Sequence, residues 1–143
     1  MSKQYNLPCN IARTLEIVGD RWTLLIVRDL LFGVRKFSDL KKSLDGISPN
    51  ILSERLQELE QQGLVTSSLY SAHPPRYQYE LTAKGSDLRH VLNALAIWGN
   101  RHLTPKYKKL VHDTCGHEVK SAYYCPDCDE YVKNISYQDN QSE

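Results

Sequence analysis

The sequence lacks the marks of membrane-spanning and secreted proteins. No apolar run approaches the roughly 20 residues that a transmembrane helix needs, and the first residues contain no apolar signal core. Hydrophobic residues make up 41% and charged residues 24% of the 143-residue chain, as in an ordinary globular protein. These features predict a cytoplasmic protein without a membrane segment.

The chain also lacks a strong charge of either sign and a recognisable catalytic set. Its formal net charge is +1, so a DNA-binding surface can only be a local patch, such as the basic pairs Arg35–Lys36 and Lys41–Lys42. The pattern contains no nucleophile with a base and an orienting group, no phosphate loop and no evident open metal site. The sequence therefore predicts a protein that is not an enzyme.

Residues 48–63 predict one helix whose two ends are both marked. Ser48 can cap the free backbone N–H groups, Pro49 suits the first helical position, and Gly63 suits the left-handed position after the last turn. Leucines at helical spacing give one face an apolar stripe, whereas the other face carries short polar side chains. The leucines are Leu52, Leu56 and Leu59, and the polar side chains are Asn50, Ser53, Glu54 and Gln57.

Small polar groups near a helix N-terminus suit close approach to base edges and phosphates, so we expect this helix to recognise DNA. Arg55, also on this helix, fits either a DNA contact or an internal salt bridge, and the salt bridge is favoured. The expected contacts in the major groove are Ser48, Pro49, Asn50, Ser53 and Gln57.

Three shorter helices are predicted before the recognition helix. We expect a first helix with the stripe Ile11, Leu15 and Val18, ended by Gly19. The second is expected over residues 21 to about 31 with Asp20 as its cap, and the third over residues 39 to about 43 with Ser38 as its cap. The third helix and the recognition helix together have the spacing of a helix-turn-helix motif.

Behind the recognition helix, the period of the hydrophobic residues changes to two. Residues 64–70 and 77–81 predict two strands, and residues 71–76 predict a loop because their two prolines cannot pair in a ladder. A hairpin in this place is a wing, and Arg76 at its tip is either a DNA contact or a solvent-exposed arginine. Phosphate contacts are expected from Lys36, Lys41, Lys42 and Arg76.

A long helix is predicted from Thr82 to about His102. Its broad apolar stripe lies beyond an already complete core, so we expect symmetric dimerisation through this helix and the first one. The alternative is that the stripe only covers its own domain. A dimer also fits DNA binding, because two recognition helices lie about one helical turn apart on DNA. The expected interface residues are Ile11, Leu15, Leu88, Val91, Leu92, Leu95 and Trp98.

Several motifs occur together over roughly residues 9–102. Among them are Gly19-Asp20-Arg21-Trp22, Arg35-Lys36-Phe37-Ser38, Ile47-Ser48-Pro49-Asn50, Ser53-Glu54-Arg55-Leu56 and Leu81-Thr82-Ala83-Lys84-Gly85. In combination they resemble the HxlR-type winged-helix transcriptional regulators. The resemblance implies a bacterial or archaeal DNA-binding homodimer that represses or activates transcription, and several members of that family respond to oxidants, electrophiles or aldehydes.

Oxidant-responsive members of that family carry a reactive cysteine just before the first helix, where this chain has Cys9. A helix N-terminus favours the thiolate, the reactive form, and Arg13 one turn further on adds positive charge. The resemblance therefore implies an oxidant or small-molecule inducer acting at Cys9. The alternative is a buried cysteine that only fills space.

Two pairs of potential zinc ligands follow the part of the chain that resembles the family core. His112 and Cys115 form the first pair and Cys125 and Cys128 the second, each with two residues between its members. This spacing is typical of a zinc ribbon and predicts one structural Zn²⁺ held by these four residues, with His117 as the alternative to His112. A redox dithiol formed by Cys125 and Cys128, or unliganded thiols, are the other interpretations.

Together these patterns predict a mainly α fold with a small β wing (α+β). We expect a winged helix-turn-helix domain over residues 1–103, a zinc-ribbon-like extension over residues 104–132 and a disordered tail over residues 133–143. The expected function is a sequence-specific transcription regulator that binds double-stranded DNA as a homodimer. The alternative is a winged-helix module used for protein contact, with the extension as its docking surface.

Overall fold

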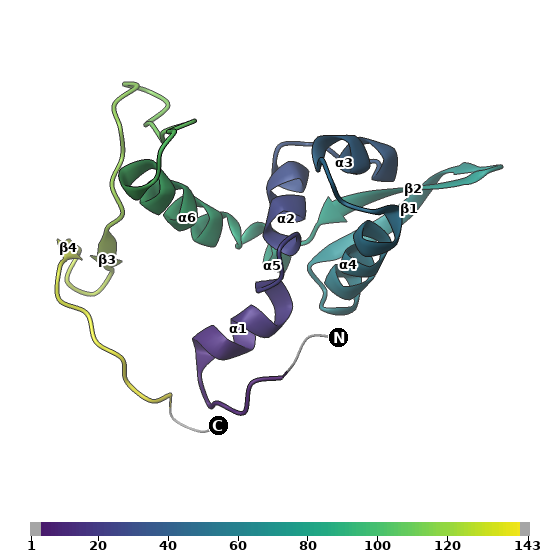
Figure 1. The fold of residues 1–143 in the computed structure, drawn as a ribbon. Coiled ribbons are helices and arrows are strands. Elements are labelled where there is room, and N and C mark those ends of the chain that lie inside the picture. The colour runs from purple at the N-terminus through teal and green to yellow at the C-terminus, as the bar shows by residue number, and fades with distance from the viewer. Residues whose placement is uncertain (1–3, 141–143) are drawn as a thin grey trace. The chain divides into compact units, whose positions relative to one another are not determined.

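The computed structural model describes residues 4–140, and the chain divides into two compact units, Met1–Leu92 and Asn93–Glu143. The elements in chain order are α1 (Asn10–Val18), α2 (Thr23–Leu31), α3 (Phe37–Ser43), α4 (Pro49–Gln61), β1 (Val65–Ala72), β2 (Pro75–Leu81), α5 (Ala83–Ser86), α6 (Arg89–His102), β3 (Tyr123–Cys125) and β4 (Glu130–Val132) (Figure 1). Helix α6 begins in the first unit and ends in the second. None of the helices among residues 4–140 is long and apolar enough to cross a bilayer.

The core of the first unit lies between α2, α3, α4 and the start of β1. The apolar stripe predicted for α4 is buried there, because none of its three leucines is more than 1% exposed. The opposite face of α4 is consequently directed away from the core. The core side chains are Ile26, Val27, Leu30, Leu40, Leu44, Ile47, Leu52, Leu56, Leu59, Leu64 and Val65.

The ends of α4 lie where the sequence predicts them. The Ser48 hydroxyl oxygen accepts a hydrogen bond from the Ile51 backbone N–H at 3.2 Å, so Ser48 is the N-cap. At the other end Gly63 has φ +73°, and the Leu64 N–H donates to the Leu59 carbonyl at 2.9 Å. These contacts satisfy groups that the helix itself leaves unpaired, and they fix the length of α4.

Helices α2 and α3 begin at positions other than those predicted. Helix α2 starts two residues late, at Thr23, because the backbone before it forms a turn around the Asp20 carboxylate. Its N-cap position is Trp22, so the prediction of Asp20 as the cap is wrong. Helix α3 starts at Phe37, so the prediction of Ser38 as its cap is wrong. The cap is Lys36, which is extended because it pairs with Gln78 of β2.

The wing is longer than predicted, because the loop between its strands is short. Ala72 pairs with Pro75 and Ser71 with Arg76, so most of the predicted loop over residues 71–76 belongs to the two strands. A proline can occupy the first residue of a strand, where its missing N–H removes little pairing. The hairpin projects beyond α3 and α4 (Figure 1).

The single long helix predicted after the wing is in fact two helices, α5 and α6. Thr82 caps α5 as expected, accepting from the Gly85 N–H at 3.1 Å. Gly85 lies so close to the backbone that a Cβ there would be 2.1 Å from the Leu64 carbonyl oxygen. This close approach fixes α5 on the start of the wing, and a turn at Asp87 then leads into α6.

In the second unit, two small hairpins follow α6. Val111 and Glu118 pair in the first, and antiparallel β3 and β4 form the second. Residues 134–140 carry no helix or strand. The predicted disorder of residues 133–143 stays a prediction, and its last three residues lie outside the described part of the chain.

Candidate nucleic-acid interface

The polar residues that the sequence assigns to DNA recognition lie on one exposed side of α4. Pro49, Asn50, Ser53 and Gln57 are all exposed, and Ser48 is exposed at the helix N-terminus. Asn50, Ser53 and Gln57 share one face because they are spaced three and four residues apart. The fold therefore presents a row of short polar side chains opposite a packed apolar face.

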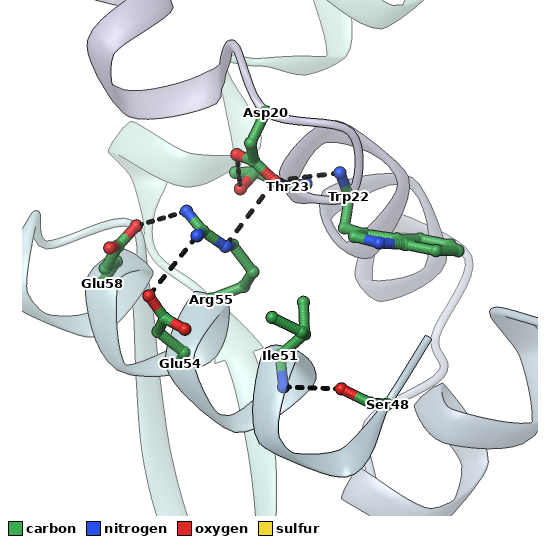
Figure 2. Close-up of polar contacts among 8 residues, drawn as sticks. All are labelled: Asp20, Trp22, Thr23, Ser48, Ile51, Glu54, Arg55 and Glu58. Atoms are coloured by element: carbon green, nitrogen blue, oxygen red, sulfur yellow. Dashed lines mark hydrogen bonds and ion pairs between the residues drawn. The ribbon is translucent and has the colours of Figure 1, made fainter. Parts of the chain in front are cut away.

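Arg55 belongs to a different side of α4 (Figure 2). Its side chain is 15% exposed, and its guanidinium pairs with Glu58 at 2.9 Å, with Glu54 at 3.5 Å and with Asp20 at 3.8 Å. The internal salt bridge anticipated from the sequence is thus the arrangement found.

Asp20 joins this cluster from the segment between α1 and α2. One of its carboxylate oxygens accepts from the backbone N–H of Trp22 at 2.9 Å and of Thr23 at 3.1 Å, and the other accepts from the Thr23 hydroxyl. Asp20 therefore stabilises the start of α2 while its negative charge faces Arg55 on α4. Sequence reasoning recognised the two roles separately and missed that the residues meet.

The basic residues expected at phosphates differ in their surroundings. Lys42 is exposed near the end of α3, Arg76 is exposed in β2 beside the tip of the wing, and Lys41 is half-buried. Lys36 is exposed, and its ammonium lies 4.8 Å above the ring of Tyr70 in the wing. This cation–π contact ties the wing to the start of α3.

Two further contacts hold the base of the wing. The Tyr79 N–H donates to the Arg35 carbonyl at 2.9 Å, and the Arg35 side chain forms an ion pair with Glu80. Burial raises the pKa of the Tyr79 phenol, and the negative charge of Glu60 and the neighbouring Tyr77 raise it further. These contacts join residues far apart in sequence, which is why local patterns did not indicate them.

Cys9, the predicted redox residue, is the N-cap of α1 and is half-buried. Its carbonyl accepts from the Arg13 N–H at 3.0 Å, which places the thiol at the first turn of the helix. The location is the one expected, and its reactivity stays a prediction.

The residues expected at a dimer interface fall into two groups. Leu88 and Leu92 are half-buried and pack against the core of their own chain, as the alternative interpretation of the stripe requires. The others are exposed large apolar side chains: Ile11, Leu15, Val91, Leu95 and Trp98. An apolar surface on α1 and on α6 is therefore left without a partner in the single chain.

The first pair of predicted zinc ligands lies in the turn of the hairpin after α6. The imidazole Nδ1 of His112 is 3.3 Å from the Cys115 sulfur. The Gly116 N–H donates to the His112 carbonyl at 2.7 Å, and the His112 N–H donates to the carbonyl of His117 at 2.9 Å. Gly116, with φ +71°, allows this tight turn.

The second pair lies in the turn between β3 and β4. Hydrogen bonds from the backbone N–H and the thiol of Cys128, and from the N–H of Asp127, lower the pKa of the Cys125 thiol. Each turn thus brings two potential ligands together. No three His, Cys, Asp or Glu side chains within residues 4–140 are gathered as a metal would require.

Helices α3 and α4 followed by the β1–β2 hairpin define a winged helix-turn-helix protein. Residues 17–107 match the family model described as HxlR-like helix-turn-helix, and the chain belongs to this family. An uncharacterized HTH-type transcriptional regulator of Mycobacterium tuberculosis, Rv3095, is 41% identical over 127 residues, which cover 86% of this chain and 79% of the relative. The matched proteins are transcription regulators and not enzymes, as the sequence predicts.

Solved structures agree with this assignment. PA1374 of Pseudomonas aeruginosa, described as a candidate transcription factor, has a TM-score of 0.69 and 42% identity, with 94% of this chain and 96% of that chain covered. A match of that length extends beyond α6 into the Cys/His region. The reduced form of the Bacillus subtilis regulator YodB has a TM-score of 0.57 and 30% identity, over 69% of this chain and 98% of its own.

Proposed function

We propose that this protein is a sequence-specific transcription regulator that binds double-stranded DNA in the cytoplasm as a homodimer. The observation that carries the proposal is the exposed polar row on α4, opposite a packed core, in a helix-turn-helix fold. Asn50 and Ser53 would read base edges in the major groove, and an asparagine can pair in bidentate fashion with adenine. Lys41, Lys42 and Arg76 would hold phosphates on either side.

Dimerisation is proposed because of the exposed apolar residues on α1 and α6. A twofold pair would cover these side chains and would present two α4 helices to successive turns of one face of the duplex. A monomer would leave both the apolar surface and half of the expected DNA contact unused.

Binding to labelled duplex DNA at increasing salt tests this function. We expect a sequence-preferring complex whose affinity falls steeply with salt, because bound phosphates release their counterions. Absence of affinity for any duplex, together with a stable protein partner, would favour a winged-helix module used for protein contact instead.

We also propose that Cys9 senses oxidants or electrophiles. Support comes from its place at the first turn of α1, and from the likeness to solved forms named reduced YodB and the redox regulator HypR in its oxidized form. Mass spectrometry after mild quinone treatment, with DNA binding followed in parallel, tests this. Modification of Cys9 without a change in DNA affinity would exclude the sensing role.

For the extension we propose one structural Zn²⁺ held by His112, Cys115, Cys125 and Cys128. Bonds of about 2.0–2.3 Å place neighbouring ligand atoms of a tetrahedral zinc about 3.5 Å apart, close to the 3.3 Å between His112 Nδ1 and the Cys115 sulfur. The first hairpin turn would supply His112 and Cys115, and the ion would join it to the turn that contains Cys125 and Cys128. Metal binding would supply folding free energy that so small a segment cannot obtain from burial.

Metal analysis with single substitutions tests the ligand set. We expect one zinc per chain, retained in Cys9→Ser but lost in Cys115→Ser and Cys128→Ser. A comparison of His112→Asn with His117→Asn identifies the histidine ligand. Substoichiometric zinc, with every cysteine reactive toward a thiol reagent, would exclude the zinc site. The remaining interpretations would be a redox dithiol or unliganded thiols.

A further inference from the structure

Asp20 and Arg55 are 35 positions apart in the chain and lie together in the fold (Figure 2). Asp20 belongs to the short segment that joins α1 to α2, and Arg55 lies in the middle of α4. Their side chains are 25% and 15% exposed, so solvent only partly screens the pair. It is an ion pair between α4 and the segment that leads into α2.

The surroundings of Arg55 make it unsuited to a phosphate. Three carboxylates face one guanidinium, because Glu54 and Glu58 of α4 also pair with it. The cluster is therefore negative overall, and a DNA phosphate brought close would be repelled. Asp20 alone among these acids is outside α4, so of the three ion pairs only Asp20–Arg55 joins α4 to another element.

Packing beside the pair is incomplete. A cavity of about 190 Å³ is lined by Glu16 and Ile17 of α1, Thr23 of α2, and Arg55, Glu58 and Leu59 of α4, among others. The buried leucines direct the apolar face of α4 to the core, but the cavity leaves this junction with fewer packing contacts to refine that orientation. The Asp20–Arg55 ion pair, which lies beside this cavity, therefore has a larger effect on the orientation of α4 than it would in a fully packed core.

We propose that Asp20 and Arg55 are a positioning pair that refines the rotation of α4 about its axis, which its buried leucines set, so that Asn50 and Ser53 face the bases. The inference rests on the proposed DNA recognition by α4. Arg55 acts through Asp20 and touches no DNA.

The test compares three variants with the full-length protein. Asp20→Asn keeps a side-chain oxygen for the turn before α2 but removes the charge that faces Arg55. Arg55→Gln removes the guanidinium, and the double variant removes both. Glu58→Gln is the matched control, because it weakens the shortest contact to Arg55 within α4 and leaves the tie to Asp20. The probes are a duplex selected from randomised DNA by the wild-type protein and a scrambled duplex of equal length.

We expect Asp20→Asn and Arg55→Gln each to reduce the ratio of affinities for selected and scrambled DNA by about tenfold, the worth of one misaligned base contact. The affinity ratio of the double variant should be no lower than that of either single variant, because each single substitution already removes the same ion pair. The slope of log affinity against log salt should stay that of the wild type in all of them. Glu58→Gln should keep the wild-type ratio.

Different results overturn the inference in recognisable ways. A salt slope shallower by about 0.9 for Arg55→Gln alone would mean that Arg55 contacts a phosphate. Lower thermal stability with an unchanged affinity ratio would mean a structural role without positioning. Additive losses in the double variant would mean that the residues act independently. If the wild-type protein selects no DNA sequence, the proposed DNA-binding function is wrong. That result is distinct from the three above, which concern only the role of Asp20 and Arg55.

Discussion

Residues on α4 with similar polarity have different environments, and these environments separate their roles. Asn50 is exposed at the first turn, whereas Arg55 one and a half turns later is enclosed by carboxylates. The helical pattern of the sequence placed Asn50 on the polar face and favoured an internal salt bridge for Arg55. Its partner outside α4, Asp20, is distant in sequence, so identifying that partner needed the three-dimensional structure.

Substitution of Asn50 and of Lys41 distinguishes base reading from phosphate binding. Asn50→Ala should reduce discrimination between the preferred sequence and its single-base variants by about 1–3 kcal/mol at one position. Lys41→Ala should weaken binding to all duplexes by a similar factor and make the salt slope shallower by about 0.9. Titration of both variants against a set of base-substituted duplexes gives the comparison. Equal effects of the two changes on all sequences would mean that another face of α4 meets DNA.

The pKa of Tyr79 predicts how stability changes at high pH. Burial and the charge of Glu60 raise it above the ordinary value of 10.0, so the folded protein disfavours the phenolate. The stability linked to this group is complete below about pH 10 and is lost as the pH rises through the folded-state pKa. Urea unfolding between about pH 9 and 11 should show a steeper decline for the wild type than for Tyr79→Phe. Tyr5→Phe, at an exposed tyrosine that does not act on Tyr79, serves as the control and should retain the steeper decline. Identical curves for the wild type and Tyr79→Phe would contradict the assignment.

At the level of whole elements, local signals and tertiary contacts determine different boundaries. The ends of α4 follow from Ser48 and Gly63 alone, because caps act within one turn. The start of α3 depends instead on the pairing of Lys36 with Gln78, and the interruption before α6 depends on the contact of Gly85 with Leu64. Such contacts leave no periodic trace in the sequence, which explains why these boundaries were missed.

Gly85 is predicted to be intolerant of any side chain. A Cβ at this position would lie 2.1 Å from the Leu64 carbonyl oxygen, and neither backbone can move without disturbing α5 or β1. Gly85→Ala should destabilise the fold by about 1–3 kcal/mol, as overpacked sites do. Gly99→Ala in α6 is the control: its nearest contact would be the Leu103 side chain, 3.8 Å away, so it should keep or slightly raise stability. Urea unfolding measures the stability of both variants. Equal stabilities would show that the backbone around Gly85 can shift to accommodate a Cβ.

At the scale of the whole molecule, the single chain leaves part of its apolar surface without a partner. Leu95 on α6 is 53% exposed, and a twofold pair would bury it. Leu95→Lys should therefore convert a dimer into a monomer and weaken DNA binding by removing one half-site contact. Phe32→Lys is the matched control, because Phe32 is 75% exposed at the end of α2, outside the proposed interface. Sedimentation of both variants tests this, and a Leu95→Lys variant that remains dimeric would place the interface elsewhere.

Selection of binding sites from randomised duplex DNA tests the central claim most directly. If a symmetric dimer presents two copies of α4, the selected DNA should contain two inverted half-sites. Their centres should lie about 10 base pairs, or a multiple of one helical turn, apart. Asn50→Ala should lose the preference at one base pair in each half-site. Recovery of unenriched DNA, or of one half-site without a symmetric mate, would contradict the account.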